Sequence, residues 1–222
     1  MTGGSPVQTL TEQLLHSRLA ERPFTSGQLQ HEIAGSPQQR HGLVNRALKA
    51  GELLKIRRGL YLLGDRYRNR TQHPFALAQA LAPGSYISLE SALAHHGWIP
   101  EAVRTIASVV PGRKSWQLDH PLVGRFSFHP LAIQRGYFLE LVERQAVNSQ
   151  VILVARPVRA LLDLVCLRKE EWQTMAWLTE ALRIEPAHLQ TIRSSDLIIL
   201  KNVYQQQRVH DFIHSLAGEL RA

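Results

Sequence analysis

Residues 36–63 read SPQQRHGLVNRALKAGELLKIRRGLYLL, and they predict a capped helix followed by a tight hairpin. Ser36 can cap the helix N-terminus, Pro37 fits the first helical position, and Gln39 completes a Ser-x-x-Gln capping box. Gly51 is expected to end the helix, because glycine tolerates the left-handed conformation required just past a helix end. The helix therefore fills the sequence between Ser36 and Gly51.

The hairpin is predicted from two apolar-rich runs, 53–57 and 60–63, which are separated by a two-residue turn, Arg58-Gly59. Because basic residues lie in and beside the turn, the tip of this hairpin is cationic. A capped helix followed by a cationic hairpin is typical of the second half of a winged helix-turn-helix, a module that reads DNA.

Two further capping boxes precede this stretch. Thr9 with Glu12 predicts the start of one helix, and Thr25 with Gln28 predicts the start of another. Three capped helices and a hairpin thus fit into residues 1–65. This part of the chain is predicted to be an N-terminal winged helix-turn-helix DNA-binding domain.

The distribution of charge supports this prediction. Residues 1–70 contain 11 Lys and Arg against 5 Asp and Glu, a net charge of +6, whereas residues 71–222 contain 15 against 13, a net charge of +2. Most of the chain's net charge of +8 is therefore in its first third. A localised basic face is the electrostatic footprint of phosphate binding, although a charge cluster alone is more often only a solvated surface.

The helix after Ser36 has two different faces. Its core side is predicted to hold Leu43, Val44, Ala47 and Leu48. The opposite face carries Gln38, Gly42, Asn45, Arg46 and Lys49. Gln and Asn can pair bidentately with adenine and Arg with guanine, whereas Lys49 is expected to meet a phosphate.

Other basic residues near this helix have two possible roles. Arg40 falls on the core side, where an ion pair at the domain edge and a DNA contact are equally reasonable. The hairpin tip can grip phosphates or the minor groove, or it can merely close the small domain. The complete set of candidate DNA-binding residues is Gln38, Gln39, Arg40, Asn45, Arg46, Lys49, Lys55, Arg57 and Arg58.

The rest of the chain is predicted to be a second domain, 74–222, joined by a linker, 66–73. The linker belongs to a polar segment whose three arginines could also extend the DNA-binding surface. Beyond it, helices are expected at 75–81 and 89–96, and strands at 105–110, 125–128, 137–142 and 150–154. Helices are expected again at 158–167 and 171–182, followed by a terminal helical group from 185 to 220. Strands followed by a run of helices indicate a mixed α+β domain with a helical C-terminal end.

Three features of the sequence indicate the cellular compartment of the protein. The first eight residues, MTGGSPVQ, lack the apolar region of a secretion signal, and the most apolar stretch, 151–167, is interrupted by Arg156, Arg159 and Asp163. No membrane partner is expected. The single cysteine, Cys166, lies in an apolar helical run, which favours a buried, inert thiol. Together these features suggest a reducing, cytoplasmic compartment.

No catalytic constellation is evident in the second domain. Phosphate-binding loops and nucleophile elbows are absent from the sequence, and Ser88 stands where a helix N-cap belongs. His210 and His214 have metal-pair spacing, but a surface histidine pair is the simpler interpretation. We therefore expect no cofactor, no metal and no enzyme activity.

Four segments resemble the AbiEi family, the antitoxins of bacterial type IV toxin–antitoxin (abortive infection) systems. These segments are RRGLYLL, HPFALAQAL, SYISLESALAHHGWIPEAV and RPVRALLDLV, and the resemblance covers roughly residues 10–170. The second-domain signature would include Tyr86, Ser88, Ser91, Ala92, Leu93, His96 and Gly97. The family gives this signature no established catalytic role, and the helical end after residue 170 is the least family-like part.

The resemblance implies a repressor that binds double-stranded DNA at the operator of its own operon through the winged helix. It also implies a second domain that counteracts a nucleotidyltransferase-like toxin encoded by a neighbouring gene. The alternative is a stand-alone winged-helix transcription factor whose second domain binds an effector or dimerises. The adjacent gene would distinguish these two functions.

Overall fold

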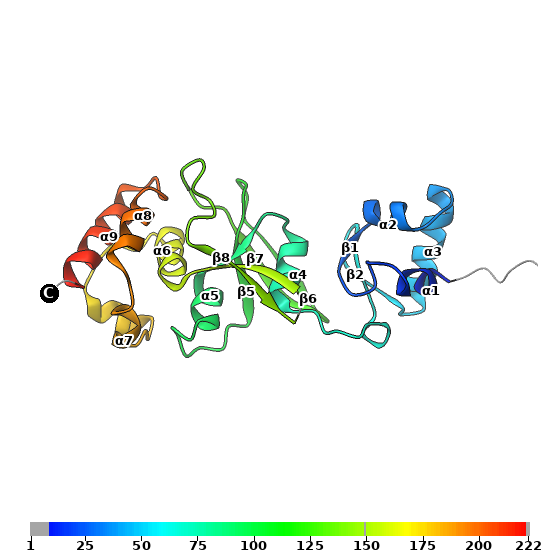
Figure 1. Ribbon diagram of the computed structural model, residues 1–222, viewed down its shortest axis with the longest axis horizontal. Helices are drawn as coiled ribbons and strands as arrows, with labels where there is room; N and C mark the ends of the chain where they lie inside the picture. Colours follow the sequence, from blue (N-terminus) through cyan, green and yellow to red (C-terminus); the bar gives the residue numbers. More distant parts are fainter. Residues whose placement is uncertain (1–8, 149, 221–222) are drawn as a thin grey trace, which may run out of the picture. The chain divides into compact units, whose positions relative to one another are not determined.

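The computed structural model describes residues 9–148 and 150–220 and has a mixed α+β fold, as the sequence predicts. The chain divides into two compact units, Met1–His73 and Pro74–Ala222 (Figure 1). Residues 1–8, on which the expected lack of a secretion signal depends, lie outside the described residues. Within the described ranges, no helix has both the length and the apolar character that crossing a bilayer requires.

The first unit consists of short helices packed on a small antiparallel sheet. Its elements are α1 (Leu10–Leu15), β1 (Phe24–Thr25), α2 (Ser26–Glu32), α3 (Pro37–Lys49), β2 (Leu53–Arg57), β3 (Leu60–Leu63) and the 3-10 turn η1 (Asp65–Tyr67). The strand order is β1-β3-β2. Leucines from α1 and the strands, together with Phe24, Ile33 and Val44, form one buried apolar core.

The local signals for these elements are confirmed. Each of the three helices begins at the capping box that the sequence predicts. Two glycines adopt positive φ angles: Gly51, between α3 and β2, at +67°, and Gly59, in the hairpin turn, at +76°. Arg57 pairs with Leu60, so the turn consists of Arg58 and Gly59 alone.

The second unit surrounds a six-stranded mixed sheet. Its elements are α4 (Pro74–Leu81), β4 (Tyr86–Ile87), α5 (Leu89–His95), β5 (Thr105–Val109), β6 (Trp116–His120), β7 (Gly124–His129), β8 (Val142–Val147), β9 (Gln150–Ala155), α6 (Pro157–Arg168), the π-helical turn η2 (Trp177–Ala181), α7 (Pro186–Leu189), α8 (Ser194–Lys201) and α9 (Gln207–Glu219). The strand order is β6-β7-β5-β4-β9-β8, with parallel pairing only between β5 and β7 and between β4 and β9. Figure 1 shows α6 between the sheet and the C-terminal helices α7, α8 and α9.

Two predicted elements of the second unit are wrong in their details, and the sequence did not predict every strand. The strand expected at 137–142 begins only at Val142, because residues 138–141 form turns that end with a left-handed Leu141 at φ 53°. Strand β6 was not predicted, since its sequence WQLDH is polar at alternate positions and lies at a sheet edge. The helix expected at 171–182 starts only after residue 174.

A buried ionic cluster joins α6 to the sheet and to the C-terminal helices. Arg159 and Asp163, one turn apart on α6, are both fully buried and form an ion pair with Nε 3.0 Å from Oδ1. Three hydroxyl groups donate hydrogen bonds to the same carboxylate: those of Tyr86 (3.0 Å), Ser88 (2.7 Å) and Tyr204 (2.8 Å). A buried charge needs such partners, because an unpaired one costs several kcal/mol.

The rest of the Arg159 guanidinium is also bound within the cluster. Its Nη1 donates to the backbone oxygen of Glu140 (2.9 Å) and its Nη2 to the Tyr86 hydroxyl (2.6 Å). Burial raises the pKa of both Tyr86 and Tyr204 well above the usual range, and the Asp163 charge raises each further. Both phenols therefore remain protonated and act as donors to Asp163.

Two second-unit residues that the sequence singles out are explained by this packing. Ser88 does stand at the N-cap of α5, but its hydroxyl makes no cap bond and is bound to Asp163 instead. Cys166 is buried, as predicted, with its thiol donating to the Gln206 side-chain oxygen at 3.5 Å. Burial raises the pKa of this thiol to about 11, which leaves little thiolate at neutral pH.

Replacing Tyr204 with Phe is predicted to destabilise the second unit, because Asp163 loses one of its three hydroxyl donors inside the protein. The expected loss is about 1–3 kcal/mol of unfolding free energy. Urea unfolding followed by tryptophan fluorescence measures it, since all 4 tryptophans lie after residue 74 and report on the second unit. Tyr137→Phe, at a tyrosine that is 39% exposed, is the matched control. An unchanged midpoint for Tyr204→Phe would show that the cluster does not stabilise the fold.

Candidate nucleic-acid interface

Helix α3 has the two faces that the sequence predicts. Val44 and Ala47 are buried, and Leu43 and Leu48 pack partly buried against the same core. The opposite face is exposed and contains Gln38, Asn45, Arg46 and Lys49. These side chains are arranged along one surface of a 13-residue helix, and all can donate hydrogen bonds.

Gly42 lies in the middle of this surface. A Cβ atom placed on it would be 3.6 Å from Nη1 of Arg46, its nearest neighbour. The Arg46 guanidinium therefore extends back along the helix over Gly42, one turn closer to the N-terminus. The lack of a side chain at Gly42 leaves room for this position of Arg46 and for close approach of a ligand to the backbone.

A contact between His41 and Asn45 was missed in the sequence. The Asn45 amide nitrogen is 3.2 Å from Nδ1 of His41, one turn away on α3. This contact orients an amide that is predicted to read a base edge. The signal for it was the i, i+4 spacing of two polar residues, which places them side by side on a helix.

Two candidate DNA-binding residues at the start of α3 make hydrogen bonds that stabilise the N-terminus of this helix. The Gln39 side-chain oxygen accepts a bond from the Ser36 amide (2.7 Å), and the Ser36 hydroxyl accepts one from the Gln39 amide (3.2 Å). Arg40 donates to the backbone oxygen of Gly35, so its partner is a carbonyl rather than the carboxylate considered from the sequence. These contacts make both side chains weaker candidates for DNA contact than their neighbours.

The hairpin β2–β3 presents Lys55, Arg57 and Arg58 as exposed side chains. The register of the hairpin shifts between Lys55 and Arg57, and Ile56, the residue between them, is buried. The tip is fixed to α2, because the amide of Ser26 donates to the backbone oxygen of Gly59 at 3.0 Å. The position of the cationic tip is thus set by the body of the unit.

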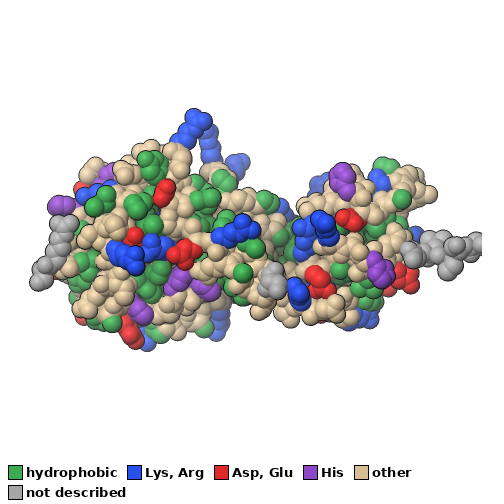
Figure 2. All heavy atoms as spheres, viewed as in Figure 1, with side chains coloured by type: hydrophobic (Ala, Val, Ile, Leu, Met, Phe, Trp, Pro, Cys, Tyr) green, Lys and Arg blue, Asp and Glu red, His purple; other side chains and the backbone are tan. Residues whose placement is uncertain are grey.

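The hairpin and α3 border a common hollow. It has a volume of about 190 Å³ and is lined by residues of α2, of α3 and by Tyr61 of β3. Lys55 pairs with Tyr61 across the hairpin, so Lys55 lies next to a residue that lines this hollow. Figure 2 shows Lys and Arg side chains on the visible face of this unit.

The segment after the hairpin packs on the first unit. The side chain of Glu21 accepts hydrogen bonds from the backbone amides of Asn69 (3.0 Å) and Arg70 (3.1 Å), and the buried Gln72 donates to the Glu21 carbonyl (2.6 Å). Of the three arginines considered as an extension of the DNA surface, Arg68 is only 5% exposed in its side chain and binds the Leu63 carbonyl at 2.8 Å. Arg68 is therefore a structural residue.

Arg66 and Arg70 remain exposed. Arg66 lies over the ring of Tyr67, with its Nη2 3.4 Å from the carbonyl of Ala50 at the end of α3. It therefore continues the basic surface of α3 beyond Lys49.

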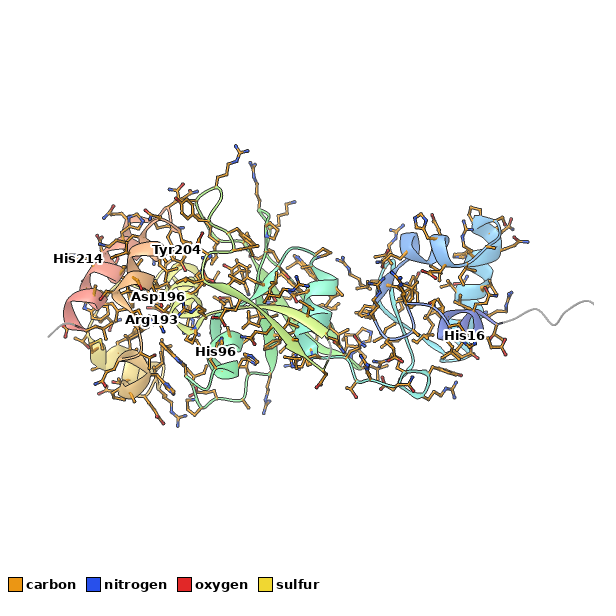
Figure 3. The ribbon with its side chains drawn as sticks, in the orientation of Figure 1. His16, His96, Arg193, Asp196, Tyr204 and His214 are labelled. Atoms are coloured by element: carbon orange, nitrogen blue, oxygen red, sulfur yellow. The ribbon has the colours of Figure 1, made fainter. Side chains whose placement is uncertain are left out.

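Two histidines of the second unit are hydrogen-bonded to backbone carbonyls. His210 is bonded to the Tyr204 carbonyl (2.8 Å), and His96 to the Ala155 carbonyl (3.0 Å). Figure 3 shows His96, Tyr204 and His214 on separate elements. Within residues 9–148 and 150–220 no group of three or more potential metal ligands is present.

Comparison with known protein families finds no family that matches the chain. No curated protein matches it either.

The adjacent glutamines of α3 are predicted to have different effects when replaced. Gln39→Ala removes one arm of the capping box and should lower the stability of α3 by about 0.5–1.5 kcal/mol. Gln38→Ala is the control, because Gln38 is exposed and takes no part in the cap. Hydrogen exchange of peptides from α3, followed by mass spectrometry, measures both changes. Equal protection in the two variants would contradict the structural role of Gln39.

Proposed function

We propose that this protein is a DNA-binding transcriptional repressor and antitoxin of a type IV toxin–antitoxin system. In this proposal residues 1–65 act as a winged helix-turn-helix and bind the operator of the protein's own operon. The second unit counteracts a nucleotidyltransferase-like toxin.

The observation that carries the DNA-binding proposal is the exposed face of α3. Gln38, Asn45, Arg46 and Lys49 form a surface of hydrogen-bond donors whose opposite side is fixed in the core. The order of elements supports the proposal, because a winged helix-turn-helix would also place two short helices before α3 and a hairpin after it. Such a module inserts its last helix into the major groove, where Asn45 and Arg46 would meet base edges.

Electrostatics supports the same proposal. The net charge of +6 in residues 1–70 includes the exposed Lys49, Arg57, Arg58 and Arg66. Cations that neutralise phosphates release counterions from DNA, so affinity falls steeply with salt. Contacts of this kind supply most of the affinity, whereas the base contacts of α3 would supply the preference for the operator.

The DNA-binding test is titration of the full-length protein with a duplex from the region upstream of its gene. Log affinity is expected to fall linearly with log salt concentration. Arg46→Ala should reduce the preference for the operator over an unrelated duplex by about 1–3 kcal/mol. Arg58→Ala should weaken binding to both duplexes evenly, unless the hairpin reads the minor groove.

Arg113→Ala is the matched control, because this arginine is exposed in the second unit and should leave DNA affinity unchanged. Affinity that does not change over about a tenfold rise in salt would contradict the proposal. If Arg46→Ala keeps the full operator preference, α3 does not read the bases.

The antitoxin part of the proposal rests on the resemblance to the AbiEi family. Two of the segments that carry the resemblance, SYISLESAL and RPVRALLDLV, supply four members of the buried cluster: Tyr86, Ser88, Arg159 and Asp163. Residues that are fully buried and hydrogen-bonded to one another do not contact a substrate. This supports the interpretation of the signature as one that maintains the fold of the second unit.

Antitoxicity is expected to be separable from DNA binding. The double variant Arg46→Glu, Lys49→Glu should lose repression, because two carboxylates would face the phosphates, but it should still rescue cells from the toxin. Leu161→Asp should lose rescue, because Leu161 is 0% exposed and an unpaired charge there unfolds the second unit. Co-expression with the toxin from the neighbouring gene, with a promoter reporter in the same cells, measures both activities. A folded, abundant double variant that fails to rescue would contradict this division of labour.

A further inference from the structure

The second unit contains a cavity of about 620 Å³ that the proposed function does not use. Its floor is one face of β5 and β7, and its walls come from α5, α6, the loop before β5 and the end of η2. Most of the wall is apolar and is formed by Leu89, Leu93, Ile99, Leu164, Leu167 and Leu182. Cavities of about 300–1,000 Å³ with apolar walls and a few polar groups are typical of small-molecule sites.

The cavity exists because the floor is built from small side chains. Parallel pairing places Ala107 beside Ser127 on one face of the sheet, and Thr105 lies on the same face two residues earlier. The neighbouring residues Phe126 and Phe128 point to the other face, where they are buried. Larger side chains on the first face would fill the space against α5 and α6.

The helix α5 is held close to this floor by specific contacts. The Ser91 hydroxyl donates to the carbonyl of Thr105 (3.1 Å) and accepts from the amide of Ala107 (2.8 Å). Leu89, the first residue of α5, has a left-handed φ of 56°, a strained conformation for a leucine. Strained backbone of this kind is often found beside ligand sites.

Four charged residues line the cavity, and three of them form ion pairs. Glu90 of α5 forms an ion pair with Arg168 of α6. Glu101, also in the lining, pairs with Arg183 at 3.1 Å. Arg104 is exposed and makes no ion pair with any residue in the described ranges 9–148 and 150–220.

His129 adds a neutral polar group to the floor. It is half-buried, and burial lowers the pKa of its ring below the usual value, partly offset by the charge of Glu90. The ring is therefore neutral at pH 7 and can donate one N–H bond. Among the charged residues of the lining, Arg104 is thus the one that has no ion-pair partner within the described ranges.

We propose that this cavity binds a small amphipathic carboxylate, with its apolar part against the leucines of α5 and α6 and its carboxylate on Arg104. A planar guanidinium binds a carboxylate through two parallel hydrogen bonds, which gives an acid an advantage over a neutral analogue of the same shape. The proposal does not depend on DNA binding or on a toxin, and it is tested without either.

The test is a calorimetric titration of the full-length protein with three probes of nearly the same shape: 4-phenylbutyrate, 4-phenylbutyramide and 4-phenylbutylamine. The acid is expected to bind about tenfold or more tightly than the amide, and the amine most weakly. Arg104→Gln should remove the preference for the acid over the amide. Arg113→Gln, an exposed arginine outside the lining, should keep it.

A second variant tests the position of the apolar part. Ala107→Leu extends a side chain into the floor and should abolish binding of all three probes, with tryptophan fluorescence confirming that the unit is folded. No binding of any probe at millimolar concentration would overturn the proposal. Equal binding of acid and amide to the wild-type protein, or an acid preference that survives Arg104→Gln, would also overturn it.

Discussion

The second unit depends on one buried carboxylate, that of Asp163. Its two oxygens accept hydrogen bonds from Arg159 and from three hydroxyl groups. These belong to a residue of β4, to the residue before α5 and to a residue between α8 and α9. Because each of these groups would be costly to bury alone, the sheet, α6 and the C-terminal helices must assemble together. The helical region from η2 to the end of α9 is therefore part of the second unit's fold.

The first unit is held together differently. Its helices are short, and each is started by a reciprocal side-chain and backbone cap that the sequence alone specifies. The apolar core then fixes which face of α3 is exposed. Local signals of this kind are why the elements of the first unit were predictable, and why Gln38, Asn45, Arg46 and Lys49 could be assigned to the exposed face before the structure was known.

Prediction from sequence was less successful where a side-chain contact depends on the folded path of the chain. Nothing in the sequence around Arg40 or Arg68 shows that their guanidinium groups bind nearby carbonyls, since such bonds depend on how the chain turns back. The same is true of Ser88, whose position predicts a helix cap but whose hydroxyl is bound to a carboxylate 75 residues away. The cavity could not be predicted either, because it requires the parallel pairing of Ala107 with Ser127. These residues lie on β5 and β7, which are neighbours in the sheet but are separated in the sequence by β6.

The two-residue strand β4 has a consequence for how the second unit responds to force and to thermal motion. It is the only strand that connects the half-sheet β6-β7-β5 to the half-sheet β9-β8 within the described residues, and it does so through three paired positions. Two buried hydroxyls beside it, those of Ser85 and Ser108, have no hydrogen-bond partner among these residues, which weakens the junction further. The sheet is thus two half-sheets joined through one short strand, and we expect slow opening of the unit to separate them only when Tyr86 and Ser88 also leave the carboxylate of Asp163.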